Sequence, residues 1–110
     1  MRVADIRRML LELPDVVEGR SYGMPSFLVH GNFLARFRDD DTVLALRIAS
    51  IDDRDVLMQL DPDAFFFTDH YKDYPAVLIR LADVPEKLLR DVLKAAHKHV
   101  ASQKPKRKKK

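Results

Sequence analysis

The sequence predicts an α+β domain in which an antiparallel sheet of about five to six strands packs with three helices. Apolar residues recur at helical spacing near both ends of the chain, and they alternate with a period of two across its middle. Glycine, proline, asparagine and aspartate divide that middle into short segments. The 110 residues fit one domain, which we expect to span residues 1–103, followed by a disordered basic tail at 104–110.

The first predicted helix opens the chain and ends before Pro14. Val3, Ile6 and Leu10 recur at helical spacing with arginines between them, so one side of the helix is apolar. Proline disfavours helical backbone at the residue before it. We therefore expect a helix whose apolar side packs against the sheet.

Three or four antiparallel strands are predicted between residues 16 and 48. If residues 39–42 form a four-residue loop, every facing pair on one side of that hairpin is apolar. The pairs are Phe33 with Ile48, Ala35 with Leu46, and Phe37 with Leu44. A slip of one residue would place Arg36, Arg38 and Arg47 in the core as unpaired charges. We therefore predict that these arginines face outward.

The preceding hairpin is expected to turn at residues 30–32. Gly31 or Asn32 can adopt the positive φ that such a turn needs. The pairs implied by a three-residue turn are Val29 with Phe33, and Phe27 with Ala35. Both hairpins then define the same core face.

A second helix is predicted to begin after Ser50 and to end at Asp61-Pro62. The Ser50 hydroxyl, followed by acidic residues, suits the N-terminus of a helix. We expect its buried side to comprise Val56, Leu57 and Leu60.

The rest of the chain is predicted as strand, loop, strand and helix. Phe65 to Thr68 is a short apolar run, and residues 70–74 form a polar aromatic loop. Ala76 to Leu81 alternates as a strand, with Arg80 opposite its apolar residues. Pro85 suits a first helical turn, and an apolar stripe then runs down a long final helix.

Composition excludes several classes of protein. No apolar run approaches the roughly 20 residues that a membrane span requires, and early charges interrupt any secretion signal. We therefore expect a cytoplasmic protein that does not associate with membranes. The absence of cysteine removes disulfides, thiolate metal sites and thiol nucleophiles.

The net charge of +3 belongs to the tail. Residues 104–110 hold six cations and no acid. The remaining residues hold 14 basic against 17 acidic side chains, a net charge of −3. Attraction of the folded part to polyanions must therefore come from local patches.

No motif for catalysis, metal binding or a cofactor stands out. The serines lack a Gly-x-Ser-x-Gly elbow, and the three glycines form no nucleotide-binding loop. His97 and His99 diverge by about 200° on a helix, so they cannot share a metal ion by themselves. Residues 39–41 lack the spacing of a calcium loop. We expect no catalytic residue, no metal, no cofactor and no enzymatic activity.

Two groups of cations are candidates for binding nucleic acid. Guanidinium groups on a β-ribbon can clamp phosphates or read guanine edges, and a lysine-rich tail can bind phosphates without reading sequence. The alternatives are a solvated sheet face whose arginines pair with acids, and a tail that serves solubility. The candidate residues are Arg36, Arg38, Arg47, Arg80, Lys94, Lys98, Lys104, Lys106, Arg107 and Lys108.

The polar aromatic loop is a further candidate site. His70, Tyr71, Lys72 and Tyr74 combine groups suited to stacking or acid–base work. The alternative is a structural loop whose tyrosines anchor it to the core with their hydroxyls in water.

Short motifs follow one another in a distinctive order along the chain. They are Leu13-Pro14-Asp15 to Glu18, Tyr22-Gly23-Met24-Pro25-Ser26-Phe27, Gly31 to Phe37, Asp61-Pro62, Phe66-Phe67-Thr68, His70-Tyr71, Tyr74-Pro75 and Val77-Leu78-Ile79-Arg80-Leu81. In this order they resemble the MmcQ/YjbR family over all but the tail. The resemblance implies a small bacterial α+β protein, compared with double-wing DNA-binding and frataxin-like folds and commonly labelled DNA-binding. Asn32 stands where that family frequently has lysine, which weakens the binding of phosphate at this position.

These observations predict a non-enzymatic, weakly specific nucleic-acid-binding protein that uses the arginine side of its sheet and its lysine-rich tail. DNA or another polyanion is the expected partner. The alternative is a protein-interaction module with no nucleic-acid role, which would use an apolar groove or open sheet edge near residues 22–27. The sequence names no protein partner.

Overall fold

The computed structural model describes residues 2–21 and 23–105, which form three α-helices and a six-stranded sheet. The helices are α1 (Val3–Glu12), α2 (Ile51–Leu60) and α3 (Glu86–Ala101). The strands are β1 (Val16–Ser21), β2 (Met24–Val29), β3 (Asn32–Arg38), β4 (Val43–Arg47), β5 (Phe65–Phe66) and β6 (Ala76–Arg80), and a short 3-10 turn is η1 (Asp69–Tyr71). Neighbouring strands are antiparallel in the order β1-β2-β3-β4-β6-β5. The predicted α+β class is confirmed.

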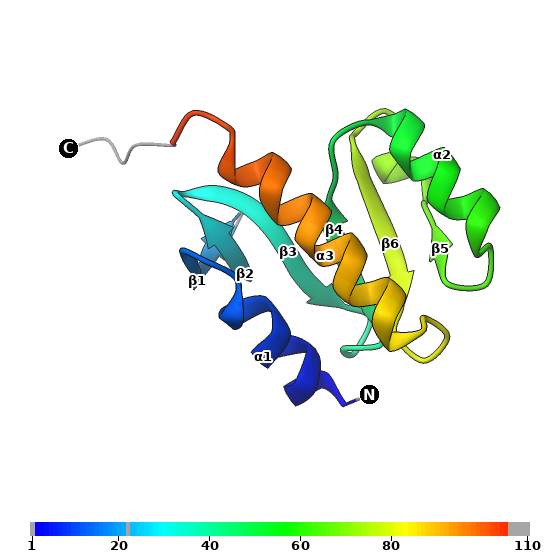
Figure 1. The fold of residues 1–110 in the computed structure, drawn as a ribbon, viewed down its shortest axis with the longest axis horizontal. Helices are drawn as coiled ribbons and strands as arrows, with labels where there is room; N and C mark the ends of the chain where they lie inside the picture. The colour runs from blue at the N-terminus through cyan, green and yellow to red at the C-terminus, as the bar shows by residue number, and fades with distance from the viewer. Residues whose placement is uncertain (1, 22, 106–110) are drawn as a thin grey trace.

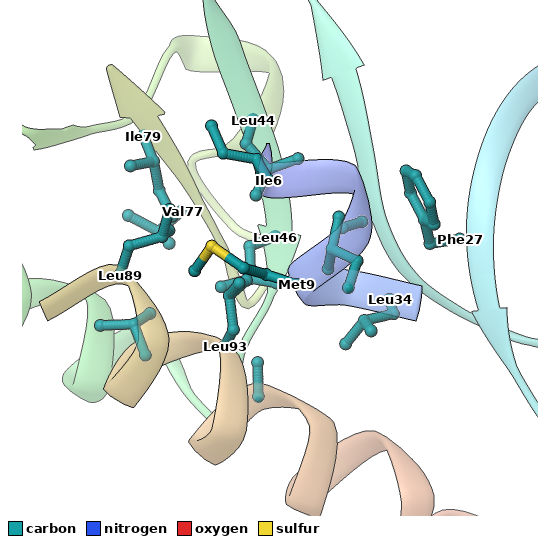
Figure 2. Packing of buried hydrophobic residues seen from close by; sticks show 14 of the residues in the cluster. Ile6, Met9, Phe27, Leu34, Leu44, Leu46, Val77, Ile79, Leu89 and Leu93 are labelled. Atoms are coloured by element: carbon teal, nitrogen blue, oxygen red, sulfur yellow. The ribbon is translucent and has the colours of Figure 1, made fainter. Parts of the chain in front are cut away.

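Two of the helices cover one face of the sheet. In Figure 1, α3 runs diagonally across the central strands and α1 lies on the same side. Figure 2 shows Ile6 and Met9 of α1 gathered with Leu89 and Leu93 of α3 around apolar side chains from the strands. The fully buried strand residues in this cluster include Leu44, Leu46, Val77 and Ile79. The main core therefore lies between these two helices and the sheet.

The β3–β4 hairpin has the predicted register. Its pairs include Ala35 with Leu46 and Phe37 with Leu44. The backbone N–H of Thr42 donates to the carbonyl of Asp39 at 3.1 Å, which closes the loop at the expected residues. Because side chains alternate along a strand, Arg36 and Arg38 lie on the side opposite to the core.

The β2–β3 turn is one residue shorter than predicted. Val29 pairs with Asn32, so the turn consists of His30 and Gly31, which have φ angles of 52° and 82°. Two successive residues with positive φ match the twist of the flanking strands, which favours a two-residue turn. The predicted pairing of Val29 with Phe33 was therefore wrong.

A bulge in β3 restores the register beyond this turn. Leu28 pairs with Phe33 and Phe27 pairs with Ala35, which leaves Leu34 as an extra residue in β3. Leu34 is fully buried in the core. Phe33, predicted for the core face, is half-buried and lines a pocket outside the core. The extra residue explains why Leu34 rather than Phe33 lies in the core, because it reverses the face of the sheet toward which the preceding side chains of β3 point.

Helix α2 begins and ends where predicted, but of its predicted buried side only Leu57 packs against the core. The backbone N–H of Asp53 donates to the Ser50 hydroxyl at 3.1 Å, which forms the expected N-terminal cap. Val56 and Leu60 were predicted to be buried, yet they are 62% and 64% exposed. The buried residue of α2 is Arg54, because the helix turns this side chain toward the loop that precedes β6.

Helix α3 carries the predicted apolar stripe. It begins directly after Pro85, and the stripe faces the sheet while lysines occupy the outward side. Its buried residues are Leu89, Val92, Leu93, Ala96 and Val100. Within the described ranges, none of the helices combines the length and apolar character needed to cross a bilayer.

Candidate nucleic-acid interface

Four arginines lie on the face of the sheet opposite to α1 and α3. They are Arg36 and Arg38 on β3, Arg47 on β4 and Arg80 on β6. The strand register places Arg36 beside Ala45, and it places Val43 between Arg38 and Arg80. Paired residues in a sheet point to the same side, so the four side chains emerge from one surface, as the sequence predicted. We call this surface the arginine face.

Few arginines of this face form ion pairs with carboxylates. Among the described residues, Arg38 alone of the four forms an ion pair, and its Nε lies 3.6 Å from Asp39 Oδ1. The arginines on α1 and α3 are paired more closely. Their pairs are Arg7 with Glu18 at 2.6 Å, Arg8 with Asp5 at 2.7 Å, and Arg90 with Glu86 at 3.1 Å. Among the described residues, the alternative that acids pair with the arginines of this face therefore holds only for Arg38.

Aromatic rings pack against three of these guanidinium groups instead. The guanidinium carbon of Arg38 lies 5.7 Å from the centre of the Tyr71 ring, and that of Arg47 lies 5.4 Å from the Tyr74 ring. The guanidinium of Arg80 lies closer to its aromatic partner, 4.0 Å from the ring of Phe66. An aromatic face attracts a cation without removing its charge, so these arginines are held in place while remaining positive.

Residues 68–74 bring the tyrosines to the arginine face, and we call this segment the aromatic loop. It contains η1 and connects β5 to β6. Tyr71 packs against a small apolar cluster of Val43, Ala45 and Leu78 on this side of the sheet. The aromatic loop thus covers part of the arginine face, which explains why Arg38 and Arg47 are only partly exposed.

Arg54 fixes the aromatic loop from the side of α2. Its Nη1 donates to the carbonyl of Tyr71 at 2.8 Å and to that of Tyr74 at 3.2 Å, and its Nη2 donates to the carbonyl of Lys72 at 2.9 Å. The ring of Phe67 lies 4.0 Å from the same guanidinium. Sequence reasoning missed Arg54, because nothing marks one arginine of a polar helix as buried.

The arginine face and the aromatic loop meet at a pocket of about 460 Å³. The pocket is lined by Ser21, Met24, Phe33, Arg36, His70, Tyr71 and Tyr74. Two candidate groups that are far apart in the sequence therefore contribute to one site. Lys72 belongs to the predicted loop site but does not line the pocket, because its backbone faces Arg54 and its side chain is exposed.

The candidate lysines are distributed differently. Lys94 and Lys98 are exposed on α3, in the layer that covers the other face of the sheet, so the fold does not join them to the arginine face. Lys104 begins the tail beside the β2–β3 turn, because Asn32 Nδ2 donates to its carbonyl at 3.0 Å. The predicted sites at Lys106, Arg107 and Lys108 lie outside the described residues.

This geometry suits the binding of an anion that also carries a flat ring. Arg36 supplies a positive charge, and Phe33, Tyr71 and Tyr74 supply aromatic surface. In the part of the chain that the structure describes, no three histidine or acidic side chains are placed to hold a metal ion.

Comparisons with known proteins agree with the fold. A family model described as YjbR matches residues 11–99. The crystal structure of a Deinococcus radiodurans protein with a DUF419 domain is similar to this chain, with a TM-score of 0.75 and 23% sequence identity. The similarity covers 92% of this chain and 79% of that chain, and at this identity it shows the fold alone. None of the curated proteins compared with this chain matches it.

Proposed function

The chain belongs to the YjbR family, and we propose that it is a non-enzymatic protein that binds nucleic acid, DNA in particular, with weak sequence specificity. The arginine face is the binding surface, and the lysine-rich tail strengthens the attraction. Arginine guanidinium groups bind phosphates through paired N–H donors, whereas the flexible ammonium groups of a lysine tail act mainly as point charges. Together they suit a backbone-directed contact that reads little sequence.

One observation carries this proposal: Arg36, Arg47 and Arg80 share a surface and have no carboxylate partner among the described residues. The folded part of the chain is acidic in total, so several arginines without a carboxylate partner on one surface make that surface locally positive. The arginines of α1 and α3 differ from these, since Arg7 and Arg90 are each paired with an acid, although Arg20 on β1 also lacks a carboxylate partner among the described residues. A surface that keeps its cations unpaired is suited to an external anion.

The start of the tail lies at the end of the β2–β3 hairpin. Asn32 Nδ2 donates to the carbonyl of Lys104, and because Asn32 pairs with the buried Val29, its side chain lies on the core side of the sheet, opposite to Phe33. The tail therefore begins on the side of α3. A polyanion bound to Arg36 would have to pass the end of this hairpin to reach cations of the tail.

Equilibrium binding with matched charge changes tests the proposal. The test variant is Arg36→Gln/Arg38→Gln/Arg47→Gln, which removes three charges from the arginine face and leaves a shorter polar side chain at each position. The control variant is Arg7→Gln/Arg8→Gln/Arg90→Gln, which removes three charges from the helices on the other side. Fluorescence anisotropy with labelled DNA, single-stranded and duplex, at about 50 to 200 mM salt measures the affinity of each.

The test variant is expected to bind DNA more weakly than the control, with a salt dependence about one unit shallower for each phosphate that is no longer neutralised. The control is expected to lose less affinity and to keep the salt slope. Equal losses in both variants would mean that total charge, rather than the arginine face, governs binding. If the unchanged protein binds no DNA in this range of salt, the proposal fails.

The rival function is an adaptor for another protein, and one observation favours it. Strand β1 is an outer strand of the sheet with Val17 56% exposed, and Met24 on the neighbouring strand is 47% exposed. An open strand with apolar side chains can pair with a strand of a partner. This function would be favoured if the protein binds no DNA and if it captures a partner protein that the Val17→Lys variant no longer captures.

A further inference from the structure

The pocket on the arginine face has the size and lining of a ligand site. Its volume of about 460 Å³ falls within the range of about 300–1,000 Å³ that is typical of sites for small molecules. Strands β1, β2 and β3 contribute one wall through Ser21, Met24, Phe33 and Arg36. The aromatic loop contributes the opposite wall. The pocket therefore needs both parts of the fold and exists only when the loop is in place.

Rings dominate the lining of this pocket. Phe33 comes from the sheet, and His70, Tyr71 and Tyr74 come from the aromatic loop. His70 and Tyr71 meet edge to face with their centres 5.1 Å apart, and Tyr71 lies 6.4 Å from Tyr74 at a tilt of 48°. Rings from two walls around one space suit a flat aromatic ligand, because base-like rings stack on phenylalanine, tyrosine and histidine.

Charge around the pocket is positive. Arg36 lines it, and this side chain has no hydrogen bond or ion pair within the described ranges. The described lining contains no acid. The guanidinium of Arg38 packs against the Tyr71 ring, and that of Arg47 packs against the Tyr74 ring. Two more positive charges therefore lie next to rings that line the pocket. The complementary ligand is an aromatic ring joined to an anion, which is the chemistry of a nucleotide.

We propose that this pocket receives one unstacked nucleotide of a single-stranded nucleic acid, with its base among Phe33, Tyr71 and Tyr74 and its phosphate at Arg36. This inference rests on the proposed function. A base in a duplex is stacked and paired, so an intact duplex cannot fill the pocket without giving up the stacking and pairing of that base. The remaining arginines of the face are placed for neighbouring phosphates, which a strand has and a free nucleotide lacks.

A fluorescent base reports directly on the pocket. The probe is a single strand of about 12 thymidine nucleotides that carries one 2-aminopurine, whose emission falls when it stacks on an aromatic ring. The test variant is Phe33→Leu, which removes a ring of the pocket and keeps an apolar side chain. The matched control is Phe37→Leu, which removes a half-buried ring from the core side of the same strand, outside the pocket lining. The measurements are affinity for single strand and duplex, quenching, and competition by a mononucleotide.

The expected result is quenching of the probe and preference for single strand over the duplex of the same sequence. Phe33→Leu should weaken single-strand binding about tenfold and weaken duplex binding much less, whereas Phe37→Leu should preserve the preference. DNA binding with equal affinity for both forms, and without an effect of Phe33→Leu, would overturn the pocket assignment but leave the proposed function standing. Competition by a mononucleotide as strong as that by the strand would also overturn it, in favour of a free nucleotide.

Discussion

The guanidinium of Arg54 donates a hydrogen bond to the backbone carbonyl of Tyr71 at 2.8 Å, so a buried charge on α2 holds the loop that covers the arginine face. The side chain is almost fully buried, with 2% of the residue exposed, and its Nε has no hydrogen-bond partner among the described residues. Backbone carbonyls and the Phe67 ring take the place of a carboxylate partner. Arg54 thereby links the second helix to the geometry of the pocket.

Replacing Arg54 by methionine should therefore destabilise the protein and open the pocket. The substitution removes hydrogen bonds to several loop carbonyls, so we expect the free energy of unfolding in urea to fall by about 2–4 kcal/mol. Arg90→Met, which removes an exposed arginine, should cost less than about 1 kcal/mol. Arg54→Lys should recover only part of the loss, because an ammonium cannot reproduce the planar fork. Equal costs for Arg54→Met and Arg90→Met would contradict this account.

The bulge in β3 predicts a difference between two neighbouring residues. Leu34 is fully buried, so Leu34→Ala should lower the free energy of unfolding by about 2–5 kcal/mol. Phe33 is half-buried outside the main core, so Phe33→Leu should cost less than about 1.5 kcal/mol. Chemical denaturation of both variants measures the difference. A larger cost for Phe33→Leu than for Leu34→Ala would show that the β2–β3 hairpin has the register without a bulge.

The tail should contribute affinity without selectivity. Removing residues 104–110 takes away six positive charges and no acid, so DNA binding should weaken and its salt dependence should become shallower. The loss should be similar for single strands and duplexes, because a lysine-rich tail binds phosphates and reads no bases. Binding titrations at several salt concentrations check both points. A truncated protein that loses all binding would leave the arginine face without a role.

Much of the fold could be predicted from local patterns. The pairing of Ala35 with Leu46 followed from alternating apolar residues on both sides of an acidic loop, since only one register kept three arginines out of the core. The bulge at Leu34 could not be predicted in the same way. Leu34 and Phe33 are both large and apolar, so either one satisfies the pattern, and the length of the turn decides between them.

Part of the candidate site could likewise be predicted from the sequence, and part of it could not. The common side of Arg36, Arg38 and Arg47 could be predicted, because a single strand register determines it. The meeting of Arg36 with the aromatic loop could not, because it depends on β6 lying beside β4 and on packing between distant segments. The anchoring role of Arg54 has the same long-range origin. The apolar residues Val56 and Leu60 predicted a different buried side for helix α2, yet both are exposed.

Chemical-shift mapping tests the central claim most directly. Amide signals of the isotope-labelled full-length protein are followed while a single strand of about 12 nucleotides is added. If the arginine face binds nucleic acid, the largest changes will fall on β3, β4 and residues 68–74, and they will weaken in Arg36→Gln/Arg38→Gln/Arg47→Gln. Changes confined to the outward sides of α1 and α3, or to residues after 103, would contradict the claim.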